Sequence, residues 1–174
     1  NTVCGFTIAQ ALPLDLNLLV EQRKGDQNFN IFYRICAFEE AEKYGLNGPN
    51  KYFYLDQGKS NINMKYEGEN FTKLSVALTT IGFSTDQKEL IFRTLAAILH
   101  VGNIYFTTFK TTSNVTLAAV ANEAELQWIA FLLNTDIGHI RRIFCDKHLT
   151  SDESEHATVL KNIDTGLDVR DAFA

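Results

Sequence analysis

The chain has 174 residues, 45% of them hydrophobic and 21% charged, which predicts about one globular domain with a buried core. Its net charge of −5 argues against a nucleic-acid binder, because such proteins carry a basic face for phosphate. No run approaches the ~18 consecutive apolar residues of a membrane span, and residues 1–10 lack the pattern of a secretory signal, so we expect a soluble, intracellular protein.

Three cysteines, Cys4, Cys36 and Cys145, are odd in number and far apart. A disulfide framework favours an even count, and zinc sites favour closely paired ligands. We therefore interpret all three as buried or half-buried thiols.

The sequence predicts a strand, a helix and a loop over residues 12–55. Leucines alternate with other residues over Leu12–Val20, which predicts a half-buried strand. Asp26 is then expected to cap a helix over Gln27–Phe38. The loop Gly45–Asn50 follows, and the aromatic run Tyr52–Leu55 is expected to anchor it on the core.

Two long helices come next. Apolar residues recur at helical spacing over Tyr66–Ile81, and Gly82 suits the left-handed position that closes a helix. Ser84–Gln87 reads as a capping box, in which the hydroxyl and the amide side chain each satisfy a backbone N–H at the helix start. The box opens a strongly apolar helix over Asp86–His100, which Gly102 ends.

The last third mixes short elements. A strand is expected over Ile104–Phe109, then a polar loop over Thr111–Thr116. Helices are expected over Asn122–Leu133 and Asp136–Cys145. After a charged stretch and a short strand near residues 158–160, Thr165 is expected to cap a last helix.

No catalytic constellation emerges from these residues. Gly58-Lys59-Ser60 ends like a phosphate-binding loop, but that loop needs an earlier glycine where this chain has Phe53. His100, at the end of an apolar helix, is interpreted as a side chain that caps the helix C-terminus. His148 and His156 lie among carboxylates, where a solvated loop is favoured over a metal site.

Four segments in order resemble the myosin motor family. Gly25–Arg34 is similar to GERNFHIFYQ, and Tyr54-Leu55 falls at the family's Y-x-YL. Ile81–Ser84 and Leu95–Phe106 together resemble lGFs … LaAILHLGNixF. Asp168–Ala174 is similar to the aRDAlAK that opens the next long helix.

The resemblance implies a mainly α fold with a few short strands, namely the upper 50 kDa subdomain with a strand of the transducer sheet. The chain, residues 1–174, is then expected to be one partial subdomain of a P-loop-containing motor head, truncated at both ends. In this family the P-loop, switch I and switch II supply the ATP and magnesium contacts, and all three are expected outside this segment. No cofactor is therefore expected on these residues, and the parent is expected to be a cytoplasmic, cytoskeletal ATPase.

The resemblance also implies partners: an actin filament and the remainder of the head. The stretches Thr107–Asn122 and Lys147–Lys161 match two family loops that reach toward actin, although ordinary surface loops explain them about as well. Asp146 to Lys161 carries four acidic and two basic residues, so contact with acidic actin would be mostly short-range. The candidate actin-facing residues are Lys110, Thr111, Asn114, Lys147, His148, Glu153, His156 and Lys161.

The chain departs from the family pattern at its start. Where the family commonly reads YLLEKSRVV, this chain has a proline at Pro13 and Asn17-Leu18 in place of Ser-Arg. Two alternatives to a cycling motor therefore stay open. One is a scaffold, derived from a myosin head, that binds actin without cycling; the other is an interaction domain unrelated to actin.

Overall fold

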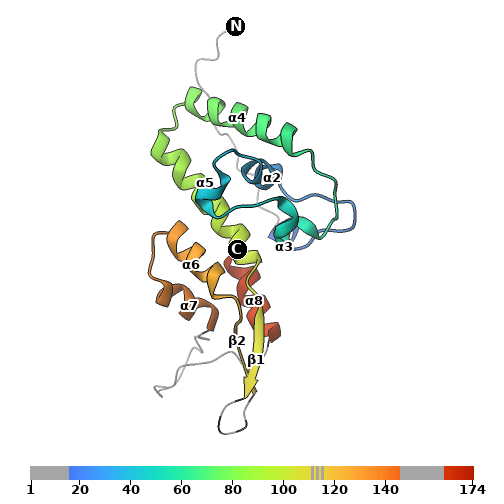
Figure 1. The fold of residues 1–174 in the computed structure, drawn as a ribbon, viewed down its shortest axis with the longest axis vertical. Helices are drawn as coiled ribbons and strands as arrows, with labels where there is room; N and C mark the ends of the chain where they lie inside the picture. The colour runs from blue at the N-terminus through green and yellow to red at the C-terminus, as the bar shows by residue number, and fades with distance from the viewer. Residues whose placement is uncertain (1–15, 111, 113, 115, 146–162) are drawn as a thin grey trace. The chain divides into compact units, whose positions relative to one another are not determined.

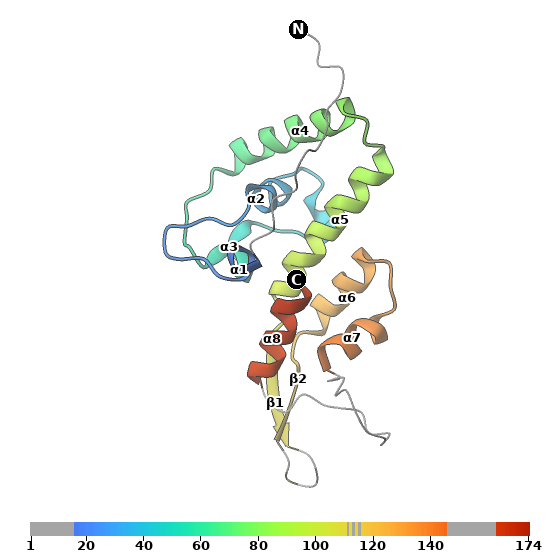
Figure 2. The same ribbon diagram turned by 180° about the vertical axis from the view of Figure 1, so that it is seen from behind.

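The computed structural model describes residues 16–110, 112, 114, 116–145 and 163–174. The chain forms two compact units, Asn1–Ala96 and Ala97–Ala174, and the boundary between them falls within one long helix (Figures 1 and 2). The described residues are mostly helical and contain one two-stranded sheet, which confirms the mainly α class with few strands.

The first unit contains helices and single turns of 3-10 helix. These are α1 (Leu16–Val20), α2 (Asn30–Cys36), η1 (Ala41–Tyr44), η2 (Pro49–Lys51), α3 (Phe53–Asp56), α4 (Met64–Thr80) and the start of α5 (Thr85–Gly102).

The strand expected over Leu12–Val20 is wrong in its described part, because residues 16–20 form α1. Leu19 is buried and Leu18 is exposed, while the backbone carbonyls of both accept hydrogen bonds from Gln22 Nε2 at 3.0 Å. No strand in the described part of this unit is available to pair with the segment. Without a partner strand, the leucine alternation has no sheet face to bury against.

Asn28, rather than Asp26, organises the start of α2. The side chain of Asn28 is 3% exposed, and its Nδ2 donates to the carbonyls of Leu19 at 2.9 Å and Tyr54 at 2.8 Å. Its Oδ1 accepts from the N–H of Phe29, and its own N–H donates to the Tyr33 hydroxyl. These bonds hold residues 28 and 29 outside the helix, so α2 begins later than the expected Gln27.

Helices α4 and α5 are joined by a tight turn that matches the expectation. Gly82 has φ of 102°, and the next N–H, that of Phe83, donates back to the carbonyl of Leu78 at 3.0 Å. The capping box is also present: Gln87 N donates to Ser84 Oγ at 3.2 Å, and Ser84 N donates to Gln87 Oε1 at 2.9 Å. Both ends of the connection therefore have their backbone groups satisfied locally.

Aromatic rings form the centre of the first unit. Phe71 of α4 stacks on Phe38 with ring centroids 4.4 Å apart and lies 4.8 Å from Phe92 of α5. Tyr52 is buried, and its hydroxyl accepts from the N–H of Asn47 and donates to the carbonyl of Gly45. The expected anchoring of the 45–50 loop by the aromatic run is thus confirmed.

The second unit combines a hairpin with three helices. Strands β1 (Phe106–Lys110) and β2 (Thr116–Val120) are antiparallel, with Phe106 opposite Val120 and Lys110 opposite Thr116. The helices are α6 (Glu123–Leu132), α7 (Ile137–Cys145) and α8 (Ile163–Phe173). The core consists of buried apolar residues from all of these elements except α8, whose Leu167 and Val169 pack against it half-buried.

Strand β2 was not predicted, and α8 starts earlier than expected. Residues 117–120 were expected to belong to the surface loop Thr107–Asn122, although their apolar character suits a strand. α8 already begins at Ile163, so Thr165 lies inside the helix and does not cap it. The charged stretch and short strand expected before α8 lie outside the described residues.

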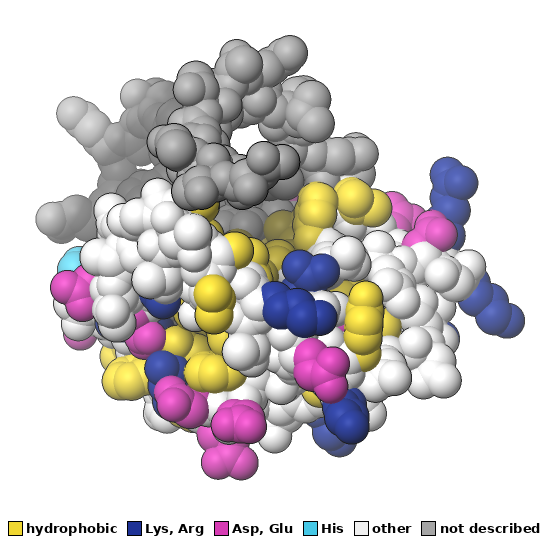
Figure 3. Space-filling model, turned by 90° about the horizontal axis from the view of Figure 1, so that it is seen from above, with side chains coloured by type: hydrophobic (Ala, Val, Ile, Leu, Met, Phe, Trp, Pro, Cys, Tyr) yellow, Lys and Arg dark blue, Asp and Glu magenta, His cyan; other side chains and the backbone are white. Residues whose placement is uncertain are grey.

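The surface of the described residues is mixed in character. Hydrophobic, acidic and basic side chains are interspersed on the face in Figure 3. Among the described helices, none has both the length and the apolar character needed to span a bilayer.

Replacing Ser84 with alanine tests the capping box. Since the N–H of Gln87 would lose its side-chain acceptor, we expect Ser84→Ala to lower the free energy of unfolding by about 1 kcal/mol. Thr94→Ala, on an exposed turn of the same helix, is the control and should stay within about 0.5 kcal/mol of wild type. Urea denaturation followed by circular dichroism measures both, and equal effects would contradict the role of the box.

Cys36 offers a second test. Burial raises the pKa of its thiol to about 12, and only the thiolate is nucleophilic. At pH 8 we therefore expect Cys36 to resist iodoacetamide in the folded chain and to react once the chain is unfolded in urea. Peptide mapping by mass spectrometry reports each cysteine separately, and rapid native labelling of Cys36 would refute its burial. The side chains of Cys4 and Cys145 lie outside the described residues.

Candidate functional site

The β1–β2 hairpin, residues 106–120, contains the candidate actin-facing residues that the structure describes. Helix α8 contacts both strands and lies beside them in both ribbon views (Figures 1 and 2). The stretch Thr107–Asn122 was expected to be a polar surface loop. Most of it is instead a paired hairpin, because Ala118 and Val120 provide an apolar side that packs on the unit's core.

The first residue of the hairpin is held by α8. Phe106 is 7% exposed, and a β-carbon added at Gly166 would lie 2.8 Å from its ring. Only glycine therefore allows this approach of helix and strand. One turn along α8, Arg170 is 6% exposed and its Nη1 donates to the carbonyl of Ile104 at 3.5 Å. Its Nε donates to Asp171 Oδ1 at 2.7 Å, which balances the buried charge.

Asn122 fastens the base of the hairpin from the other side. Its Oδ1 accepts from the N–H of Tyr105 at 3.1 Å, and its Nδ2 donates to the carbonyl of Asn103 at 2.8 Å. The N–H of Ala121 donates to the Tyr105 carbonyl at 2.9 Å. Asn122 does precede α6, as expected, but its side chain makes no capping bond to that helix. It ties the two ends of the hairpin together instead.

Beyond this base, strand β1 is exposed. All four residues of β1 after Phe106 are exposed, including Phe109 at 43% and Lys110. Asn114 is also exposed and has φ of 60°, a left-handed conformation that asparagine tolerates better than most residues. Lys110 is the single charged residue in the sequence from 106 to 120, and the rest is rich in threonine. Such a surface offers hydroxyl, methyl and amide contacts at short range, with one cation.

The structure thus places two of the eight candidate residues, Lys110 and Asn114, on one exposed hairpin. The other six lie outside the described residues: Thr111, Lys147, His148, Glu153, His156 and Lys161.

A buried histidine in the second unit has a role that sequence reasoning missed. His100 was interpreted as a helix-capping side chain, but it is 2% exposed, and its Nδ1 lies 2.6 Å from Glu125 Oε2. Its ring also stacks on Trp128, with centroids 5.7 Å apart. The pair joins the last turns of α5 to the first turn of α6. The signal in the sequence was the Glu125–Trp128 spacing of three, which places both side chains on one face of α6.

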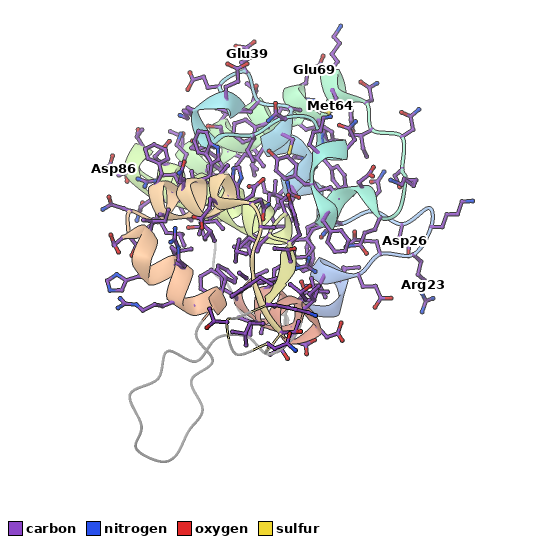
Figure 4. The ribbon with its side chains drawn as sticks, turned by 60° about the horizontal axis from the view of Figure 1, so that its bottom comes forward. Arg23, Asp26, Glu39, Met64, Glu69 and Asp86 are labelled. Atoms are coloured by element: carbon purple, nitrogen blue, oxygen red, sulfur yellow. The ribbon has the colours of Figure 1, made fainter. Side chains whose placement is uncertain are left out.

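The Gly58-Lys59-Ser60 segment is packed against a turn of the backbone. A β-carbon at Gly58 would lie 2.0 Å from the carbonyl oxygen of Asp26, and the carbonyl of Gly58 accepts from the N–H of Gly25 at 2.8 Å. Ser60 Oγ donates to the Asp26 carbonyl at 2.9 Å, and Lys59 pairs with Asp56. Arg23 and Asp26, labelled in Figure 4, belong to the turn that this segment contacts.

Residues 2–174 match the protein family described as "Myosin head (motor domain)". The chain belongs to this myosin head family. Its motifs, from Gly25 to Ala174, are therefore those of a myosin motor, as the sequence predicted.

Individual myosins are similar over all or most of this chain. It is 32% identical to unconventional myosin-XV of Homo sapiens and 34% identical to the myosin-K heavy chain of Dictyostelium discoideum, in both cases over its full length. It is 30% identical to myosin-15 of Arabidopsis thaliana over 92% of its length. The chain spans 5%, 20% and 11% of these relatives, respectively.

The family implies ATP and magnesium in the parent protein, and the described residues do not fit either group. The one Gly-Lys-Ser segment has no room for a phosphate, since its glycine contacts backbone and its lysine and serine already have partners. In the part of the chain that the structure describes, no three His, Cys, Asp or Glu side chains are grouped to hold a metal ion. No step of ATP chemistry is assigned to these residues.

The contact between α8 and the hairpin can be tested by adding one methyl group. Gly166→Ala would force a β-carbon against the Phe106 ring, and we expect a loss of about 1–3 kcal/mol in the free energy of unfolding, as for overpacked cores. Asp168→Ala, exposed on the same helix, is the matched control and should change stability by less than about 0.5 kcal/mol. A wild-type stability for Gly166→Ala would contradict this packing.

The His100–Glu125 pair gives a second test in the same unit. Glu125→Ala leaves the buried Nδ1 of His100 without this partner, so we expect a loss of about 1–3 kcal/mol in unfolding free energy. Glu123→Ala, also in the first turn of α6, removes an exposed ion pair with Arg141 and should cost less than about 1 kcal/mol. Thermal or urea unfolding compares the two, and a larger loss at Glu123 would overturn the assignment.

Proposed function

We propose that this chain is part of an actin-based, ATP-driven cytoskeletal motor. In this proposal it is the upper 50 kDa subdomain of the head, with its strand contribution to the transducer sheet, and its role is mechanical and actin-facing. Membership of the myosin head family is the observation that carries the proposal. The parent would be the ATPase, with ATP and magnesium bound by the P-loop and switches in other parts of the head.

The hairpin supports an actin-facing role by its construction. Its base is held by Gly166, Arg170 and Asn122, while Phe109 and Lys110 are exposed near its free end. A rigid base with an exposed tip transmits force and presents a fixed surface to a partner. Because Lys110 is the hairpin's one charge, it matches acidic actin, and the surrounding threonines supply short-range contacts.

A scaffold that binds actin without cycling is the second candidate. The observation that favours it is the start of the chain, where Asn17-Leu18 replaces the family's Ser-Arg. An altered transducer strand would weaken the link between nucleotide state and actin binding.

Actin cosedimentation distinguishes the candidates. The motor head that contains this chain is mixed with filaments, with and without ATP. Binding that ATP releases supports the cycling motor, and binding that ignores ATP supports the scaffold. An absence of binding in both conditions would contradict both.

Replacing Phe109 and Lys110 with alanine in that head tests the hairpin itself. We expect the double variant to bind actin about three- to tenfold more weakly in the absence of ATP, since an aromatic contact and a complementary charge are lost. Lys65→Ala, exposed on α4 in the first unit, is the control for a lost positive charge. An affinity unchanged in the double variant would remove the hairpin from the interface while leaving family membership intact.

A further inference from the structure

The first unit contains a pocket of about 270 Å³ between α4, α5 and the η1 turn. Its apolar floor is formed by the rings of Phe38, Phe71 and Phe92, of which the last two are 2% and 6% exposed. One wall is Val76, which is 61% exposed at the rim. A concave, mostly apolar site with a few convergent polar groups is the usual form of a small-molecule site, and this volume suits a ligand of one or two rings.

The charged side chains of the pocket differ in whether they have a partner of opposite charge. Glu89 Oε2 accepts from the Tyr44 hydroxyl at 2.8 Å and pairs with Lys43 Nζ at 3.3 Å. Burial, reinforced by the bond to Glu89, raises the pKa of Tyr44 to about 12, so the hydroxyl stays protonated and keeps donating at neutral pH. The negative charge of Glu89 is therefore compensated within the pocket wall.

Lys88, on the same wall, has no such compensation. Its Nζ donates to Thr79 Oγ1 at 2.9 Å and lies 3.4 Å from Ser75 Oγ, and both partners are neutral hydroxyls. None of the ion pairs among the described residues includes Lys88. A half-buried ammonium beside an aromatic floor leaves one cation available to a ligand.

We propose that this pocket binds a small aromatic carboxylate, with its ring on Phe71 and Phe92 and its carboxylate on Lys88. A phosphate is disfavoured, because the N–H groups of Ser84 and Gln87 at the start of α5 already donate within the capping box. This site shares no residue with the hairpin that is proposed to contact actin.

A neighbouring groove does not compete with this assignment. It has a volume of about 530 Å³ and is lined in part by Glu39, Met64 and Glu69, all labelled in Figure 4. Its two carboxylates are exposed, and nothing in the described residues points to a ligand between them.

To test the proposal, the full chain is titrated with 2-naphthoate and, separately, with its neutral analogue 2-naphthalenemethanol. Calorimetry measures the affinity of each ligand. We expect the carboxylate to bind about tenfold more tightly than the alcohol, because only the carboxylate forms a charge-assisted hydrogen bond with Lys88. Raising NaCl from about 0.05 M to about 0.5 M should weaken naphthoate alone, since salt screens a half-exposed charge. Equal affinities, or no binding of naphthoate, would overturn the proposal.

Variants locate the binding. Lys88→Met should reduce naphthoate affinity about tenfold, to that of the alcohol, and leave the alcohol unchanged. Val76→Phe, at an exposed rim position, should block both ligands by filling the pocket. Lys73→Met, an exposed lysine of α4 that does not line the pocket, is the matched control and should bind both ligands as wild type does.

Circular dichroism first establishes that each variant is folded. Naphthoate binding that survives Val76→Phe, or that falls equally in Lys73→Met, would place the ligand elsewhere and refute the site. The salt dependence of naphthoate affinity tests the ion pair with Lys88 in the wild-type chain, without any substitution. An affinity that does not fall with salt would contradict that ion pair.

Discussion

The contact between Phe106 and Gly166 sets the geometry of the second unit. Because residue 166 has no side chain, α8 approaches the hairpin closely enough to bury the Phe106 ring. The same approach brings Arg170 to the carbonyl of Ile104, where its charge is balanced by Asp171. Overpacking at this position would displace the helix, the arginine and the strand together. The exposed end of the hairpin can present a fixed surface only while this base holds.

The first unit depends on polar anchoring in a comparable way. Asn28 joins the carbonyls of Leu19 and Tyr54, which are far apart in the chain, and its burial makes each of these bonds costly to lose. In the same unit, the ring of Phe71 packs against those of Phe38 and Phe92. The pocket follows from that arrangement, because these three rings lie at the junction of α4, α5 and η1 and line its floor.

The family match establishes what this chain is related to, whereas the described residues show which contacts its own side chains can make. The myosin head match establishes ancestry and fold family over nearly the whole chain. The described residues themselves offer an exposed hairpin with one cation and a packed Gly-Lys-Ser turn that cannot receive a phosphate. The role of the hairpin toward a partner therefore rests on the proposal and not on the family match.

The sequence by itself determined the family and most of the helices. The capping box at Ser84, the left-handed Gly82 and the apolar spacing of α4 and α5 are local signals, because each depends on residues within one or two turns. Of the eight candidate site residues, Lys110 and Asn114 are described and exposed, and their contact with actin stays a prediction.

Only the tertiary structure decided the features that join distant segments. Residues 16–20 are helical, and no strand among the described residues pairs with them. Asn28, rather than Asp26, organises the start of α2 through its bonds to Leu19 and Tyr54. Strand β2 and the pairing of His100 with Glu125 likewise required a partner 6 to 25 residues away to be brought into contact. The hydrophobic pattern and the residue propensities of a segment indicate the secondary structure that it prefers in isolation. Burial and long-range hydrogen bonds in the folded chain then decide which secondary structure it adopts.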